Sequence, residues 1–263
     1  MFNRRLVDKD IEDWIFEQWG MLHQRLGPEK PLGSSAMVLP RPGEFGSAAP
    51  SPAETAQRIF DRVQQLAGLE NWPVKLEGFE ALKPEQVSEY VFLAPEQQQA
   101  AGLFITGDGN EPIIRYDLDA VNRPMDLIAT FAHELAHYLL IATQIDTGDM
   151  GEEAELLTDL AAVYMGFGVF LANSAFEFGG HQGFYGSGWS SKRQGYLSEN
   201  SLLVATALFA RTSGNDPEEA TPFLKNRLHK SWKKALKQVD RRQDAIELMR
   251  KADNGFSETL AQA

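Results

Sequence analysis

The sequence predicts an α+β protein that is mostly helical, with a small antiparallel or mixed sheet in its N-terminal part and a helical C-terminal half. Two patterns lead to this prediction. Short β-prone runs separated by turn residues occur between residues 74 and 116, and apolar residues recur at helical spacing through most of the remainder. With 263 residues, 43% of them hydrophobic, the chain is long enough to bury a substantial core.

Helix-ending, helix-starting and turn residues divide the first part of the chain. Gly27-Pro28 ends the first helical pattern, and Ser51-Pro52 is typical of a helix start. The turn Gly107–Asn110 joins two β-prone runs and favours a hairpin. The expected elements are a helix over 8–26, a Pro- and Gly-rich connection over 28–52, a helix from Pro52 to 66 or 67, a strand over 74–77, a short helix after Pro84, and hairpin strands over 102–106 and 112–116.

Helical patterns dominate the second part. The interruption is a run rich in glycine and aromatic residues over 173–197, which predicts a loop. The expected helices are 124–141, 152–172, 198–211, one that begins at Asp216, and a basic helical end over 225–252.

Composition excludes several kinds of site and partner. There is no cysteine, so disulfides, thiolate zinc sites and cysteine nucleophiles are excluded, and any metal must be held by His, Asp or Glu. The N-terminus lacks the apolar core of a signal peptide, and no apolar run approaches the ~18 residues of a membrane span. From these two observations we expect a cytoplasmic protein. A net charge of −12 argues against nucleic acid and anionic membranes as partners.

The charge is uneven along the chain. Residues Lys225–Lys251 include ten basic and three acidic side chains, a net charge of +7. A solvated helical face or a tail packed on an acidic body explains this, and a site for an acidic partner at the basic C-terminal helices is the alternative.

The motif His133-Glu134-Leu135-Ala136-His137 is an H-E-x-x-H pattern within a predicted helix. Residues four apart lie on the same face of a helix, so both imidazoles can reach one ion, while Glu134 can meet a water bound to it. The flanking residues are uncharged, and an unpaired Glu134 among them would be costly to bury. The motif therefore predicts a Zn²⁺ site, although two His and one carboxylate also accept other divalent metals.

A third ligand is expected from the next helix. Glu155 and Asp159 are four apart and share a helical face, and Asp159 lies in an apolar stretch that leaves it in need of a partner. Either carboxylate can ligate a metal. Glu152 and Glu153 are further candidates, although acids at a helix start often serve only the helix dipole.

This spacing resembles the E-x-x-x-D element of the gluzincin zinc peptidases, the thermolysin-like clan. The resemblance implies a zincin-like fold in which His133, His137 and Glu155 bind zinc and Asp159 holds His133. Asp159 would be the ligand in the aspzincin pattern, and no H-x-x-G-x-x-H extension follows His137 as metzincins require. The sequence is also similar, over roughly residues 100–210, to an uncharacterised bacterial family of HELAH proteins. The residues that show this similarity are 129–137, 157–160, 166–173 and 195–199.

These features predict a zinc peptidase in which Glu134 acts as general base on a metal-activated water. The oxyanion needs a donor, for which Tyr196 is the first choice and His181, Tyr185 and Arg193 are alternatives. A substrate backbone could pair with a strand at 113–116, which could equally only cover the core. The expected substrate is a peptide or protein. The alternatives are a non-catalytic scaffold stabilised by zinc and a regulatory protease that cleaves one cognate protein.

The expected organisation has three parts. They are an N-terminal helix and connection over 1–50, a zincin-like metallopeptidase domain over 51–215, and basic C-terminal helices over 216–263 that pack on the same domain.

Overall fold

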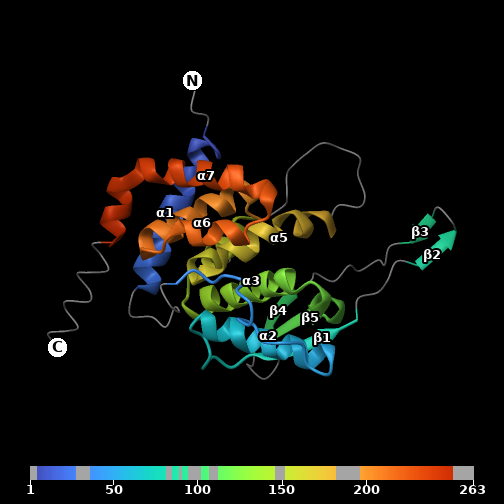
Figure 1. The fold of residues 1–263 in the computed structure, drawn as a ribbon. Coiled ribbons are helices and arrows are strands. Elements are labelled where there is room, and N and C mark those ends of the chain that lie inside the picture. The colour runs from blue at the N-terminus through green and yellow to red at the C-terminus, as the bar shows by residue number, and fades with distance from the viewer. Residues whose placement is uncertain are drawn as a thin grey trace.

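A computed structural model describes residues 5–27, 36–80, 85–88, 91–93, 102–106, 112–145, 152–181 and 196–250. The protein is mostly helical with a small sheet, which confirms the coarse prediction. Figure 1 shows the sheet and helix α2 (Pro52–Leu66) on one side of the central helix α3 (Pro124–Ala142). On the other side lie helices α5 (Gly168–His181), α6 (Glu199–Ser213) and α7 (His229–Val239).

Helix α3 (Pro124–Ala142) is central because it is apolar on nearly every side. Leu127, Phe131, Leu135 and Leu139 are all buried, and so are most residues between them. A helix of this kind has to be surrounded by other elements. It is contacted by helices α2, α4 (Glu152–Ala162) and α5 and by strands β4 (Gly102–Thr106) and β5 (Pro112–Asp117).

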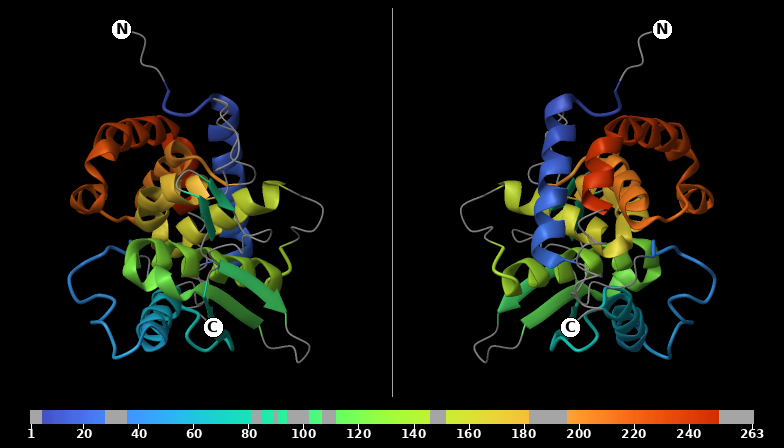
Figure 2. Two further views of the ribbon diagram at one scale, coloured as in Figure 1. Left: turned by 90° about the vertical axis from the view of Figure 1, so that its right-hand side faces the viewer. Right: turned by 90° about the vertical axis from the view of Figure 1, so that its left-hand side faces the viewer.

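The first two helices lie where the sequence predicts them. Helix α1 (Lys9–Leu26) buries Trp19 and Leu22 among others, and Gly27 follows it with a φ of 46°. Helix α2 (Pro52–Leu66) begins with Pro52, and the side chain of Ser51 accepts a hydrogen bond from the Glu54 N–H. Figure 2 shows α1 beside the C-terminal helices, and α1 contacts α6.

The N-terminus is tied to α7 (His229–Val239) by a buried glutamine. Gln238 Oε1 accepts a hydrogen bond of 2.6 Å from the Leu6 N–H, and Gln238 Nε2 donates one of 2.6 Å to Glu12. Because Glu12 is buried, these bonds and the ion pair with Arg5 compensate its desolvation.

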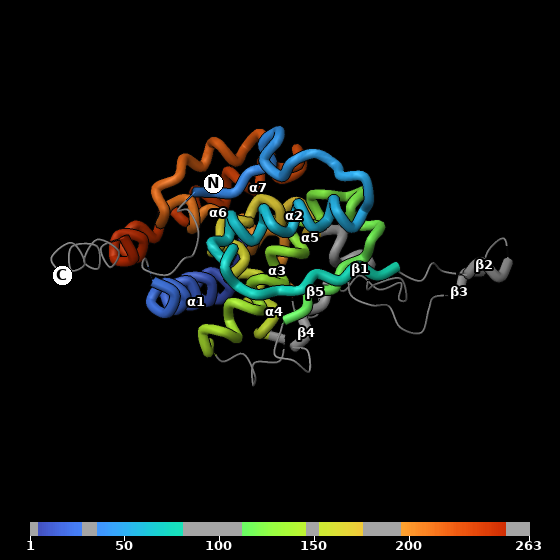
Figure 3. Tube along the Cα trace, turned by 90° about the horizontal axis from the view of Figure 1, so that it is seen from below, coloured from blue at the N-terminus to red at the C-terminus, as the bar shows by residue number. Residues whose placement is uncertain are grey.

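The sheet next to α3 has the strand order β1-β5-β4. Strand β5 (Pro112–Asp117) pairs parallel with β1 (Lys75–Phe79) and antiparallel with β4 (Gly102–Thr106). The parallel β1–β5 pair is incompatible with a purely antiparallel sheet. Figure 3 shows the sheet together with α2 from below. The strand at 113–116 is therefore central and not available as an edge, and β4 is the edge strand nearest α3.

Strands β2 (Glu85–Ser88) and β3 (Val91–Leu93) pair antiparallel in a separate two-stranded sheet. The expected short helix after Pro84 is therefore wrong. Nothing in the periodicity of four residues distinguishes a short strand from one helical turn. The predicted turn at 107–110 lies outside the described residues.

A single helix over 152–172 is also wrong, because the chain bends in its middle. Helix α4 (Glu152–Ala162) leads into a π-helical turn at Val163–Phe167, and α5 (Gly168–His181) follows. Gly166 has a φ of 98°, and its carbonyl accepts a hydrogen bond of 3.1 Å from the Val38 N–H. The predicted loop over 173–197 therefore begins later, and residues 182–195 lie outside the described part.

The stretch Glu153–Ala175 is long and apolar enough to cross a membrane, which the sequence prediction missed. However, 78% of its most apolar window is buried inside the protein. Core helices have the same composition, so this stretch is explained by its place in the core.

The C-terminal part consists of helices α6 and α7, a further helical stretch over 243–250, and several short turns. A 3-10 turn at Leu118–Asn122 precedes α3, and others follow α6 at Pro217–Phe223, Asn226–Leu228 and Asp240–Arg242. Helix α6 (Glu199–Ser213) starts at Ser198, whose side chain accepts from the Ser201 N–H, and ends at Gly214 in the left-handed region. The helix expected from Asp216 is thus a short 3-10 turn. Helix α7 buries Trp232 and Val239 and packs on α6.

We predict that Gly166→Ala lowers the free energy of unfolding by roughly 1–3 kcal/mol. The φ of 98° disfavours any side chain, and a Cβ would lie 3.0 Å from the Ala36 carbonyl oxygen. Urea unfolding of the metal-free protein measures the change. Gly20→Ala in α1 is the control, because its Cβ would meet only Met249 at 3.8 Å. That variant should be neutral or more stable by up to about 1 kcal/mol, and an equal loss in both variants would contradict the explanation.

Candidate metal centre

The two motif histidines project from the middle of α3 toward α4. Their Nε2 atoms lie 3.1 Å apart. Both come from an uninterrupted helix, since no Gly or Pro follows Pro124 within α3, and residues four apart therefore stay on one face. His133 is buried, and His137 is partly exposed.

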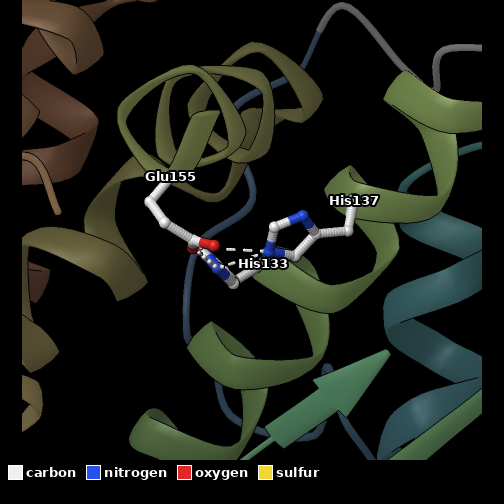
Figure 4. A group of neighbouring side chains, drawn as sticks. All are labelled: His133, His137 and Glu155. Carbon is white, nitrogen blue, oxygen red and sulfur yellow. Dashed lines mark hydrogen bonds and ion pairs between the residues drawn. The ribbon is translucent and has the colours of Figure 1, made fainter. Parts of the chain in front are cut away.

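Helix α4 contributes a carboxylate to the same point. Oε2 of Glu155 lies 3.2 Å from Nε2 of His133 and 3.4 Å from Nε2 of His137 (Figure 4). The three side chains form a group that could hold a metal ion. The structure therefore brings together the three residues that the sequence predicts as ligands.

The spacing of these three atoms fits a metal ion. Zinc holds nitrogen and oxygen ligands at about 2.0–2.2 Å, so two ligands of a tetrahedral ion are roughly 3.3–3.5 Å apart. The separations of 3.1, 3.2 and 3.4 Å are close to this value. A proton or a metal ion among the two Nε2 atoms and the carboxylate oxygen accounts for such close spacing. This donor set suits zinc but does not select it over other divalent metals.

Asp159 fixes the ring of His133. Its Oδ1 accepts a hydrogen bond of 2.9 Å from Nδ1 of His133, which leaves Nε2 to face His137 and Glu155. The other oxygen, Oδ2, accepts a bond of 2.8 Å from the Leu197 N–H. Asp159 therefore acts on His133 through its ring and is not part of the group of three facing atoms. The bond to Leu197 was not predicted, because a backbone donor leaves no mark in a sequence.

Thr158 contacts Nδ1 of His137, as Asp159 contacts Nδ1 of His133. Its hydroxyl donates to the carbonyl of Ala154 at 2.9 Å, so its oxygen can only accept from Nδ1–H of His137, at 3.3 Å. This direction leaves the lone pair of His137 on Nε2, where the facing group lies. Thr158 was missed from the sequence. Its spacing of three from Glu155 places it on the same helical face and would have indicated it.

The pKa values reflect this cluster of charges. Burial lowers the pKa of His133, but the hydrogen bonds to Asp159 and Glu155 and the nearby charges more than compensate and raise it to about 10. The hydrogen bond from His133, with the neighbouring ring of His137, holds the pKa of Glu155 well below its usual range. Without a metal, the proton on His133 is the cation of the site.

Glu134 and Tyr196 lie close to the same cluster. Glu134 is buried, and its charge raises the pKa of both His133 and Tyr196. The ring of Tyr196 is 5.5 Å from that of His133, centroid to centroid. Burial and the carboxylates of Glu155, Asp159 and Glu134 raise the pKa of Tyr196 to about 12, so its hydroxyl keeps its proton.

The other predicted candidates are not placed at the cluster. Glu153 is exposed and is not among the three facing residues. Tyr185 and Arg193 and the side chains of His181 and Glu152 lie outside the described part of the chain.

None of the protein-family models matches the chain, and neither a curated protein nor a solved structure is significantly similar to it. The resemblance to gluzincins therefore depends on the motif residues and on the geometry of the cluster.

We predict that Thr158→Val weakens metal binding about 10- to 100-fold, because the valine cannot accept the His137 proton and hold the ring in this tautomer. Thr158→Ser should bind nearly as tightly as the wild type. A competition titration with a chromophoric chelator measures both affinities, and ¹⁵N shifts of His137 report the tautomer. Thr143→Val is the control, since within the described part of the chain the Thr143 hydroxyl bonds only to the carbonyls of Leu139 and Leu140. Equal affinities for the valine and serine variants would contradict the role of Thr158.

We predict that metal binding at pH 7 releases about one proton. His133, with a pKa of about 10, is protonated in the metal-free site, and coordination requires the neutral ring. Affinity should rise about tenfold per pH unit until that pKa is reached. Conversely, the raised pKa stabilises the metal-free fold fully below pH 6.5, and this contribution is lost as the pH rises through about 10. Calorimetry in two buffers of different ionisation enthalpy counts the protons, and no release at pH 7 would refute the prediction.

Proposed function

We propose that this chain is a gluzincin-type zinc peptidase, with zinc held by His133, His137 and Glu155. The observation that supports the proposal is the triangle of facing atoms with edges of 3.1–3.4 Å, whose first histidine is held by Asp159 four residues after Glu155. The helix pair α3–α4 thus has the arrangement that the resemblance implies. The zincin-like fold is part of this proposal.

The side chains around the cluster have distinct tasks. When bound, zinc supplies a Lewis acid that lowers the pKa of a water and polarises a carbonyl. Glu134 accepts a proton from the attacking water and delivers it to the leaving amine. Its burial near His133 keeps it close to the reacting groups.

Tyr196 is suited to stabilise the negative charge that develops on the substrate oxygen. With a pKa of about 12 its hydroxyl stays protonated and can donate a hydrogen bond at neutral pH. The bond from the Leu197 N–H to Asp159 holds the adjacent backbone in place. Tyr196 and His133 are therefore positioned by the same carboxylate.

Strand β4 offers a place for an extended peptide. It packs against α3, and its far edge pairs with none of the described strands. A peptide in β conformation can add to such an edge through main-chain hydrogen bonds. The substrate class that fits the proposal is a peptide or a protein segment in extended conformation.

The function is tested with Glu134→Gln and Glu155→Gln. Glu134→Gln should keep one zinc per chain and lose activity by on the order of 10²–10⁴-fold, because the amide cannot accept the proton. Glu155→Gln should lose metal affinity. Metal analysis and a mass-spectrometric peptide-library assay measure the two properties.

Glu153→Gln on the exposed side of α4 is the matched control and should change neither property. Full activity in Glu134→Gln would exclude the general-base assignment. A fully metal-loaded wild type that cleaves no peptide in the library would favour the non-catalytic scaffold.

A further inference from the structure

The outer face of α7 has a row of five cations, and none of them has a carboxylate partner among the described residues. Lys230, Lys233, Lys234 and Lys237 lie within one face of the helix, and Arg241 continues it in the following turn; these residues are called the basic row. All five are exposed, and none forms an ion pair with another described residue. Helix α7 lies in the outermost layer of the molecule, over α6 (Figure 1).

The basic row differs from the other cations of the protein. Most other described lysines and arginines have a carboxylate within 4 Å, and these include Arg5, Lys9, Arg41, Arg62, Lys75, Arg115, Arg123, Arg211, Arg227 and Arg242. This is expected for a chain with 37 acidic and 25 basic residues. However, the segment from Lys225 to Val239 contains no acidic residue at all.

This arrangement opposes the stability of the helix. Lys230 and Lys234, and likewise Lys233 and Lys237, are four apart, so like charges face each other along the surface. Lys230 also lies in the first turn, where the helix dipole disfavours a positive charge. A ligand of opposite charge would remove both effects.

We propose that the basic row binds an acidic segment of a partner polypeptide. From Lys230 to Arg241 the helix rises by roughly 16 Å, which an extended segment of about five residues spans. A short segment contacts only the row. The whole chain, with the row included, has a net charge of −12. Salt screens exposed charges beyond about 8 Å, so a short acidic segment bound at the row is repelled little by the acidic rest of the protein.

The surroundings of the row fit a polypeptide better than other polyanions. The described chain exposes no aromatic side chain on which bases could stack, and four of the five cations are lysines, which cannot bind phosphate in the bidentate manner of arginine. The exposed Leu248 follows the row, but the exposed Asp244 and Glu247 beside it would be repelled by an anionic bilayer.

The test uses the full chain and needs neither metal nor activity, so its outcome is independent of the proposed peptidase. A fluorescein-labelled peptide with five consecutive glutamates is titrated with the protein at 20 and 150 mM NaCl, and fluorescence anisotropy gives Kd. A peptide with five glutamines is the neutral comparison. Vesicles with 30% phosphatidylserine and a 20-base-pair DNA duplex are the other arms.

Lys230→Gln/Lys234→Gln should weaken binding of the acidic peptide at least fivefold and leave the fold intact. Loss of the like-charge pair should raise Tm by roughly 1–3 °C. The matched control is Arg58→Gln/Arg250→Gln, which removes two exposed cations outside the row and should change Kd less than twofold.

The proposal is overturned if the wild type does not bind the acidic peptide at 20 mM NaCl, or binds the glutamine peptide equally well. It is also overturned if both double variants behave alike, or if vesicles or DNA bind more tightly than the peptide.

Discussion

The carboxylate of Asp159, buried between three segments of the chain, is the interaction on which the site depends. Burying a charged group is costly unless each of its oxygens has a partner. Asp159 meets this requirement with Nδ1 of His133 on α3 and with the N–H of Leu197 just before α6. One group therefore fixes the ring of His133, the rotation of α4 relative to α3, and the position of Tyr196. These three features cannot vary independently.

The bend between α4 and α5 makes this contact compatible with the rest of the core. Helix α4 has to present Glu155, Thr158 and Asp159 to α3, while α5 has to pack against both α3 and α6. The π-helical turn around Gly166 changes the direction of the chain between the two tasks. Just after this turn, α5 and α6 approach each other closely at Gly168, where a Cβ would collide with Thr206 of α6. The packing of these two glycines thus places α4 so that Glu155 can meet His133 and His137.

The parts of the fold and site that the sequence predicted are those determined by local spacing. Residues four apart on a helix must share a face, and this rule alone brings His133 to His137 and Glu155 to Asp159. The apolar surroundings of Asp159 predicted a partner, and the resemblance to gluzincins named His133. The helix starts at Ser51 and Ser198 likewise follow from local capping chemistry.

The features that were missed depend on contacts between distant residues. The bend at Gly166 is invisible because the apolar pattern continues through it, and the strand at 85–88 is too short to show a period. The parallel pairing of β1 with β5 depends on how the chain returns across the sheet. Leu197 holds Asp159 through its backbone N–H. Thr158 can accept from His137 because its own hydroxyl proton is donated to the Ala154 carbonyl. Neither is encoded by residue type alone.

The charges of the cluster explain why a divalent cation suits it better than a proton. With neutral imidazoles, the carboxylates of Glu134, Glu155 and Asp159 would be three anionic groups in the cluster without a cation. The proton that His133 takes up in the metal-free site, where its pKa is about 10, compensates one of them. A divalent ion among the three facing atoms compensates two and allows His133 to be neutral. The same negative field raises the pKa of Tyr196 to about 12, which keeps a hydrogen-bond donor beside an otherwise anionic group. The electrostatics that favour a metal thus also preserve the phenolic proton that a peptidase would need.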